Sequence, residues 1–213
     1  MHAVASPSFG DTSVLAPRSG YRKLGAGERA ALLIVDMQNA FIDEAGALAR
    51  DALAGSAALL SAFRQADRPV FFGALRAPSM AEMNLRWREL GDVERLVKGT
   101  PSAEIHSDLS PRASELVVEK VHASCFYGTS LEAALEAERI DTLVVAGTAT
   151  SGCIRATVVD AAARSLRVLV AEDAVFDWRV LSGEVALNDI AERYGDVVSV
   201  GDVLAVLQGV SGA

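Results

Sequence analysis

Short, uninterrupted apolar runs alternate along the chain with longer stretches in which apolar residues return every three or four positions. The runs have the length of buried strands and cover Ala30 to Val35, Pro69 to Leu75, Leu116 to Val118, Thr142 to Ala146, Val168 to Ala171 and Val197 to Val200. The helical spacing covers Ala45 to Gln65, Ala81 to Leu90, Ser130 to Arg139, Cys153 to Ser165 and Gly183 to Arg193. Strands that are apolar on both faces and separated by helices are typical of a covered parallel sheet. The pattern therefore predicts an α/β fold, a three-layer α/β/α sandwich around a mostly parallel six-stranded sheet.

The domain organisation follows from length and local composition. The first 20 residues are rich in Ser, Pro, Gly and Ala and have no hydrophobic period, so residues 1–20 are interpreted as a flexible amino-terminal arm. The remaining residues, 21–213, suffice for one well-cored domain, because 51% of the 213 residues are hydrophobic. The stretch from Arg76 to Ser114 is the least regular, and we expect it to form loops over one edge of the sheet.

Charge and cysteine content narrow the possible partners. The chain has 20 Lys and Arg against 28 Asp and Glu, a formal charge of -8 that disfavours nucleic acid. There is no basic, apolar leader, and no apolar run approaches the ~20 residues that span a bilayer, so we expect a cytoplasmic protein without a membrane partner. The two cysteines, Cys125 and Cys153, are too few for a disulfide framework, and the histidines have no metal-ligand spacing. The sequence therefore predicts neither a metal nor a cofactor.

Three residues with reactive side chains follow apolar runs. Asp36 follows ALLIV, Lys120 follows LVVE, and Cys153 follows LVVAGTATSG. Ligands of open α/β sheets bind beyond the carboxyl ends of the strands, where side chains that are distant in sequence meet. Although the two glycines in GTATSGCI have the spacing of a phosphate-binding loop, a cysteine and an isoleucine replace its lysine and hydroxyl residue, which disfavours nucleotide binding.

The alternative is a thiol at a helix amino terminus. That position lowers a thiol pKa and supplies N–H groups for an oxyanion, with Asp36 as proton acceptor and Lys120 as a nearby cation. Each residue also has a structural interpretation. Cys153 could be a buried small hydrophobe, Asp36 a helix cap and Lys120 a solvated strand end. Occurring together, the three favour a nucleophilic site. Cys125, in VHASCFYGT, is interpreted as structural.

The motifs ALLIVDMQNAF, VVEKVHASCFYGTSLE and DTLVVAGTATSGCIRATVVDAAARSLRVLVAEDAV resemble the isochorismatase-like cysteine hydrolases, in the family's order from about Tyr21 to Leu207. The resemblance implies a catalytic triad with Asp36 as base, Lys120 as cation and Cys153 as nucleophile. It also implies a cis peptide between Thr148 and Ala149, with the N–H groups of Ala149 and Cys153 forming the oxyanion hole.

Within the family, YRKLGAGERAALLIVDMQNAF and SGCIRATVVDA are most similar to the N-carbamoylsarcosine amidase group. The segment FFGALRAPSMAEMN lacks the histidine that nicotinamidases use to bind a metal, which disfavours both a metal and nicotinamide. The amidase group usually has a carboxylate-binding arginine where EDAVFDWRV has Trp178, with Arg179 one position later. A larger or less charged acyl group is therefore expected, unless Arg179 turns into the pocket.

The resemblance predicts a cysteine-dependent amidohydrolase that cleaves a C–N bond of a small amide or N-carbamoyl substrate. Phe41, Trp87, Trp178 and Arg179 are the candidate substrate contacts. Two alternatives remain: vinyl ether hydrolysis, as in isochorismatases, and a binding protein that retains the fold without turnover. Relatives of this kind imply a homo-oligomer, a dimer or a tetramer.

Overall fold

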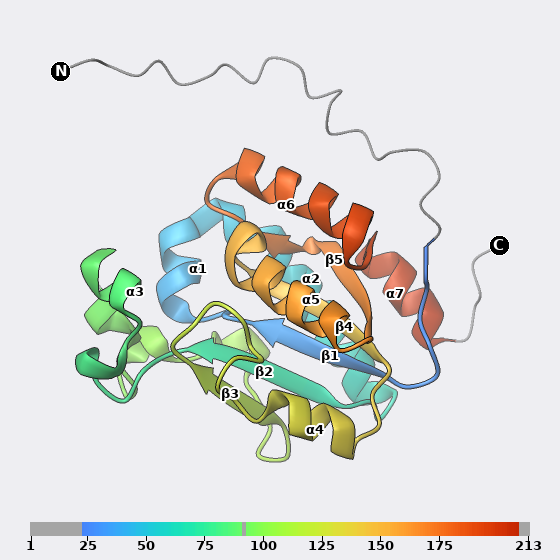
Figure 1. Ribbon diagram of the computed structural model, residues 1–213, viewed down its shortest axis with the longest axis horizontal. Helices are drawn as coiled ribbons and strands as arrows, with labels where there is room; N and C mark the ends of the chain where they lie inside the picture. Colours follow the sequence, from blue (N-terminus) through green and yellow to red (C-terminus); the bar gives the residue numbers. More distant parts are fainter. Residues whose placement is uncertain (1–22, 91–92, 209–213) are drawn as a thin grey trace.

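Six strands form one sheet in the order β3-β2-β1-β4-β5-β6, and every neighbouring pair is parallel (Figure 1). This arrangement confirms the predicted parallel sheet. The computed structural model describes residues 23–208 except 91–92, so the predicted arm over 1–20 lies outside the described residues. The strands are β1 (Ala30–Val35), β2 (Val70–Leu75), β3 (Leu116–Lys120), β4 (Thr142–Thr148), β5 (Arg167–Phe176) and β6 (Asp196–Val198).

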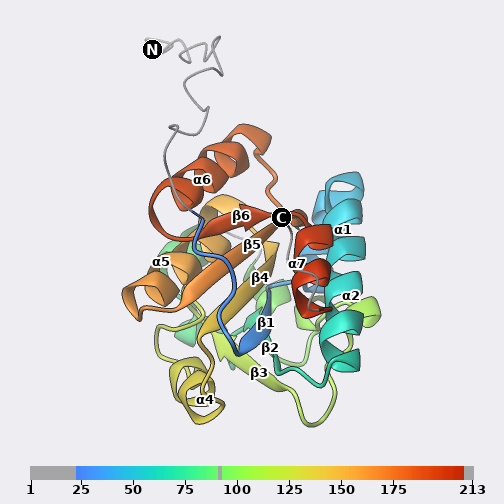
Figure 2. The same cartoon turned by 90° about the vertical axis from the view of Figure 1, so that its right-hand side faces the viewer.

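Helices cover both faces of the sheet, which confirms the three layers. Figure 2 shows α1, α2 and α7 on one side of the strands and α4, α5 and α6 on the other. No helix in the described ranges has the length and apolar content needed to cross a membrane. The helices are α1 (Asn39–Ala45), α2 (Arg50–Gln65), α3 (Leu85–Leu90), α4 (Leu131–Ala137), α5 (Arg155–Ala163), α6 (Val180–Arg193) and α7 (Val200–Leu207).

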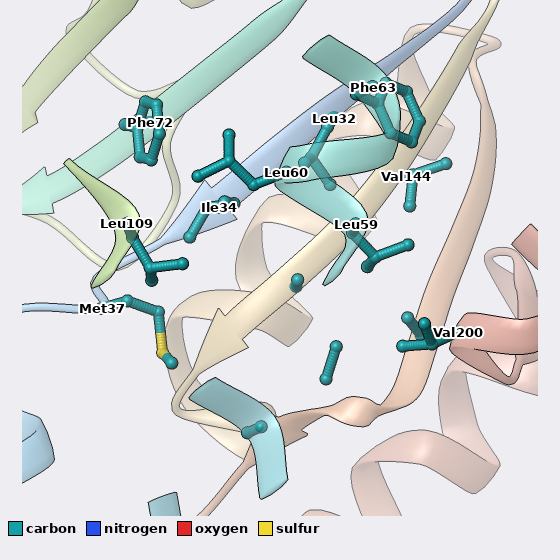
Figure 3. Close-up of a cluster of buried hydrophobic side chains, with 14 of the residues drawn as sticks. Leu32, Ile34, Met37, Leu59, Leu60, Phe63, Phe72, Leu109, Val144 and Val200 are labelled. Carbon is teal, nitrogen blue, oxygen red and sulfur yellow. The ribbon is translucent and has the colours of Figure 1, made fainter. Parts of the chain in front are cut away.

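The continuous apolar strands arise because successive side chains enter different cores. In β1, Leu32 and Ile34 pack with α2 residues such as Phe63 (Figure 3), whereas Leu33 and Val35 belong to the core under α5. Each of these side chains is almost fully buried. Because both faces of the strand are covered, β1 shows no alternation of apolar and polar residues.

Two helices were not predicted from the sequence. The run predicted as a strand from Val197 to Val200 ends at Val198, and Val200 begins α7. Ser199 accepts a hydrogen bond from the N–H of Asp202, and the Asp202 carboxylate accepts one from the N–H of Ser199. This reciprocal cap starts a helix although the following residues are as apolar as a strand. Helix α1, which was also not predicted, is a single short element after β1.

The segment between β2 and β3 contains short 3-10 turns and α3, in keeping with the irregular stretch expected from Arg76 to Ser114. The predicted helix from Ala81 to Leu90 is shortened to α3, because residues Met80–Glu82 form a 3-10 turn.

The chain reverses its direction of winding between β1 and β4, and the candidate chemistry lies at this point. Asp36 directly follows β1, and Lys120 is the last residue of β3. Val35 is paired with Gly147, whose φ is +118° and where an added Cβ would lie 2.0 Å from the Val35 carbonyl oxygen. Glycine is thus required where the two strands approach, and the crevice beyond their carboxyl ends is the expected ligand site of this topology.

Candidate active site

Lys120 contacts both of the other reactive side chains predicted from the sequence, Asp36 and Cys153. Its Nζ donates to Asp36 Oδ2 at 2.7 Å and lies 3.3 Å from Cys153 Sγ. A third contact runs to the carbonyl oxygen of His122 at 3.2 Å. The Lys120 and Asp36 side chains are 0% and 1% exposed, so this ion pair is removed from water. The structure thus brings together an acid, a cation and a thiol from three strand ends.

Asp36 is held in an uncommon backbone conformation. Its φ is +53°, in the left-handed region that residues other than glycine rarely adopt. The surrounding backbone stabilises it, because the Asp36 N–H donates to the Gly73 carbonyl at 2.8 Å and its own carbonyl accepts from the Gln38 N–H at 2.8 Å. Asp36 Oδ1 is buried and has no hydrogen-bond partner among the described residues. It is therefore an acceptor available to a reacting proton.

Cys153 lies in a wide helical turn that precedes α5. Residues Thr150–Ile154 form a π-helical turn in which the Ile154 N–H donates to the Ala149 carbonyl at 3.1 Å. The sequence placed Cys153 at the first position of a regular helix, but α5 begins at Arg155. The peptide between Thr148 and Ala149 is cis, as the family resemblance implied. The wide turn places Cys153 between the end of β4 and the start of α5, a common setting for functional residues.

Asp177 fixes this turn from the neighbouring strand. Its Oδ2 accepts hydrogen bonds from the N–H and the hydroxyl of Ser151 at 2.8 and 2.7 Å, and its Oδ1 accepts from the N–H of Arg179 at 3.0 Å. Sequence reasoning did not identify Asp177. Its position directly after β5 was the available signal, because Asp36 likewise directly follows β1.

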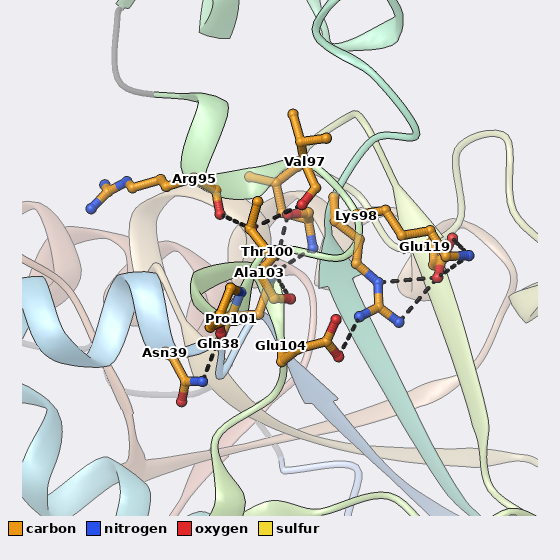
Figure 4. Close-up of polar contacts among 12 residues, drawn as sticks. Gln38, Asn39, Arg95, Val97, Lys98, Thr100, Pro101, Ala103, Glu104 and Glu119 are labelled. Carbon is orange, nitrogen blue, oxygen red and sulfur yellow. Dashed lines mark hydrogen bonds and ion pairs between the residues drawn. The ribbon is translucent and has the colours of Figure 1, made fainter.

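A second support comes from a buried glutamine. Gln38 donates to the carbonyls of Leu75 and Ala103 at 3.2 and 2.7 Å, and accepts from the Leu75 N–H at 2.7 Å. Asn39 reaches the carbonyl of Pro101 at 2.9 Å (Figure 4). These bonds attach the irregular segment to the ends of β1 and β2, since a buried amide needs its donors and acceptor satisfied. Gln38 was also not identified from the sequence.

A cavity of about 260 Å³ opens beside Cys153. Three of the four predicted substrate contacts, Phe41, Trp87 and Trp178, line it, whereas Arg179 is exposed and does not. The other lining residues are Asp36, Leu75, Ala123, Thr148, Ala149, Gly152 and Cys153. Wider hollows of 470 and 610 Å³ lie at the amino ends of the strands, away from the thiol, so they are poor candidates for the reaction site.

The protonation of the site corrects one prediction. Burial has the largest effect on the Cys153 thiol and, together with the negative charge of Asp36, raises the pKa of this thiol well above its ordinary value although Lys120 opposes the shift. The predicted lowering of this pKa at a helix terminus is therefore wrong for the resting site. Burial alone lowers the pKa of Lys120, but nearby negative charge, above all that of Asp36, outweighs it and raises that pKa. The resting site holds an ion pair and a neutral thiol.

Cys125 is a second buried thiol, 0% exposed, which packs against the backbone of β2. An added Cβ at Gly73 would lie 2.5 Å from Cys125 Sγ, and the Cys125 N–H donates to Thr157 Oγ1 at 3.0 Å. Burial raises the pKa of Cys125 from 9.0 to about 11, against the opposing charge of Lys120. Cys125 does not line the cavity, in keeping with its structural interpretation.

The raised Cys125 pKa predicts a loss of stability at alkaline pH. The unfolded chain releases this proton near pH 9.0 and the folded chain near 11, so the stabilisation is complete below pH 9 and is lost as pH rises through 11. Between about pH 8 and pH 10, the Cys125 contribution to the free energy of unfolding falls by roughly 1 kcal/mol. Urea unfolding at both pH values should give a shallower decline for Cys125→Ala than for the unchanged protein. Equal declines would show that the thiol titrates alike in both states.

The described residues contain no group of three or more His, Cys, Asp or Glu side chains that could hold a metal ion. The reactive side chains that the structure brings together are a buried ion pair and a thiol. Arrangements of this kind suit nucleophilic attack on a carbonyl carbon.

The comparisons with known proteins agree with this geometry. The Isochorismatase domain model matches residues 30–202. The maleamate amidohydrolase of Pseudomonas putida is 33% identical over 197 residues, covering 90% of this chain and 92% of that protein. The N-carbamoylsarcosine amidase of an Arthrobacter species is 31% identical over 208 residues, covering 92% and 78%. The crystal structure of a cysteine hydrolase from Pseudomonas syringae superposes with a TM-score of 0.83 at 26% identity, covering 90% and 99%. The chain therefore belongs to the isochorismatase-domain family of hydrolases.

Proposed function

We propose that this protein is a cysteine-dependent amidohydrolase that cleaves a C–N bond of a small amide. The observation that carries the proposal is the contact of Lys120 Nζ with both Asp36 and Cys153 Sγ at the wall of a cavity. The similarity to a maleamate amidohydrolase and an N-carbamoylsarcosine amidase supports amide C–N hydrolysis rather than another reaction of the fold.

The first half of the proposed reaction forms a covalent intermediate. Cys153 Sγ bonds to the amide carbonyl carbon while its proton passes to the Asp36 carboxylate, which removes the obstacle of the raised thiol pKa. The carbonyl oxygen becomes negative, and the N–H groups of Ala149 and Cys153, two residues that line the cavity, stabilise it. The C–N bond then breaks, and Asp36 returns the proton to the departing ammonia or amine.

The second half releases the product. Asp36 takes a proton from water, the hydroxyl bonds to the thioester carbon, and the bond from carbon to sulfur breaks to give a carboxylic or carbamic acid. The sulfur recovers its proton from Asp36, which had taken it from water, and Lys120 stabilises each negative charge that forms beside it. The same acid and cation thus serve both halves of the cycle.

The base assignment predicts a large loss of turnover in Asp36→Asn. Asparagine has nearly the same volume but cannot accept the thiol proton, so kcat should fall by about 10²- to 10⁴-fold. The measurement is ammonia release from a panel of small primary amides, N-carbamoyl amino acids and ureido acids. Circular dichroism and the unfolding midpoint establish whether the variant is folded. A folded Asp36→Asn protein with full activity would remove Asp36 from the mechanism.

A further inference from the structure

The cavity beside Cys153 has mainly apolar walls. Phe41, Leu75, Trp87 and Trp178 surround it, and Asp36 and Cys153 are the titratable side chains that line it. No Arg, Lys or His is among its lining residues in the part of the chain that the structure describes. The cavity therefore presents a negative carboxylate and aromatic surface to the substrate, and no positive group.

Lys120 does not fill this role, because its hydrogen-bonding capacity is already used. An ammonium group has three N–H donors. The three contacts to Asp36, His122 and Cys153, at 2.7 to 3.3 Å, account for all of them. The side chain is also fully buried, so a second carboxylate could reach the ammonium only by displacing Asp36 or Cys153.

Trp178 closes the cavity on another side with aromatic carbon. Its ring packs edge-on against Phe41 and Phe176, with centroids 5.7 and 5.3 Å away. The indole Nε1 has no hydrogen-bond partner in the described part of the chain, and it is buried, so the N–H does not lie on the cavity surface. Arg179, the residue before α6, is exposed and contributes nothing to the lining. Among the described residues, this side of the cavity thus has no charged side chain that could hold a carboxylate.

We propose, building on the amidohydrolase function, that the substrate is an uncharged amide with a small apolar acyl group of alkyl or aryl type. A carboxylate placed in this cavity would lose its water without gaining a charged partner, and it would lie near Asp36. An apolar group would instead exchange water for aromatic surface. The volume of about 260 Å³ limits the group to roughly the size of one ring. Maleamate and N-carbamoylsarcosine each carry a carboxylate, so this specificity differs from that of the named relatives.

A pair of matched substrates tests directly whether a carboxylate on the acyl group is disfavoured. Maleamate and (Z)-but-2-enamide have the same length and double bond, and differ in a carboxylate against a methyl group. We expect kcat/KM for ammonia release to favour (Z)-but-2-enamide by about 100-fold or more, the scale of leaving one buried charge unpaired. Benzamide, as the aryl case, should also be cleaved. A kcat/KM for maleamate equal to or above that for (Z)-but-2-enamide would overturn the proposed specificity and leave the amidohydrolase function standing.

Two substitutions assign the selectivity to Trp178. Trp178→Arg places a cation at the cavity wall, and it should shift the ratio of kcat/KM values toward maleamate by about 100-fold. Trp178→Phe removes the N–H and keeps an aromatic wall, so it should retain the preference for the uncharged amide. Loss of the preference in Trp178→Phe would contradict an apolar role for the ring. A loss of maleamate cleavage in Arg179→Ala would mean that this guanidinium enters the cavity, which would also contradict the proposal.

A binding measurement separates the specificity from the function. The chain has two tryptophans, and both line the cavity, so intrinsic fluorescence reports occupancy. In Cys153→Ala, (Z)-but-2-enamide and benzamide should change the emission saturably, and maleamate should not at the same concentrations. Tighter binding of maleamate would overturn the specificity. Failure of the unchanged, folded protein to release ammonia from any amide, with the binding preference intact, would instead count against the amidohydrolase function.

Discussion

Cys153→Ala is expected to reduce amide hydrolysis by about 10⁴-fold or more, because it removes the atom that forms the covalent intermediate. Alanine retains the β-carbon and leaves the ion pair of Asp36 and Lys120 in place, so the fold should be preserved. Initial rates of ammonia release, measured with active amides from the panel, give the loss. Rapid quenching followed by mass spectrometry should find an acyl or carbamoyl adduct on Cys153 in the unchanged protein and none in the variant.

Cys125→Ala is the matched control, because it removes the second buried thiol without touching the cavity. Its kcat should stay within about threefold of the unchanged value, since no proposed step uses that sulfur. If Cys153→Ala remained active while Asp36→Asn did not, water rather than sulfur would be the attacking group. That result would favour hydrolysis of the vinyl ether type. If neither substitution changed a measured activity, a binding protein that retains the fold would be the better interpretation.

Lys120→Met is expected to lower the free energy of unfolding by about 3 to 5 kcal/mol, because it leaves the Asp36 carboxylate buried without its cation. Methionine keeps most of the apolar length of lysine and removes the charge. The Asp36 side chain is 1% exposed and cannot recover the lost interaction from water. Urea unfolding near neutral pH, followed by circular dichroism, measures the difference.

The double variant Asp36→Asn, Lys120→Met provides the control for this prediction. Removing both charges eliminates the unpaired carboxylate, so the double variant should be more stable than Lys120→Met alone. The resulting cycle gives the coupling between the two side chains. A cost below about 1 kcal/mol for Lys120→Met would contradict a buried, ionised pair, since exposed ion pairs contribute that little.

Local patterns in the sequence predicted the strands and most of the helices. The apolar runs and the three- and four-residue spacing depend on which faces are buried, and these periods are visible without coordinates. These patterns did not predict α7. Its residues, VGDVLAVL, are apolar enough for a strand, and the reciprocal hydrogen bonds between Ser199 and Asp202 start the helix instead. The patterns also missed α1, a helix of only seven residues.

The order of motifs also determined the candidate reactive residues. Asp36, Lys120 and Cys153 each follow an apolar run, and parallel strands bring their carboxyl ends to one edge of the sheet. Gln38 and Asp177 were missed because their roles depend on partners 26 or more residues away, such as Leu75 and Ser151. A local sequence pattern does not show which residues so far apart in the chain will be hydrogen-bonded.

The sequence by itself therefore determined the layers of this protein, the family to which it belongs and three reactive residues, because hydrophobic period and motif order are properties of the chain. Only the tertiary structure decided the state of the thiol, because a pKa depends on burial and on charges brought from other strands. Only the structure placed Arg179 outside the cavity, because Trp178 and Arg179 lie in the bend between β5 and α6, where no hydrophobic period fixes the direction of a side chain.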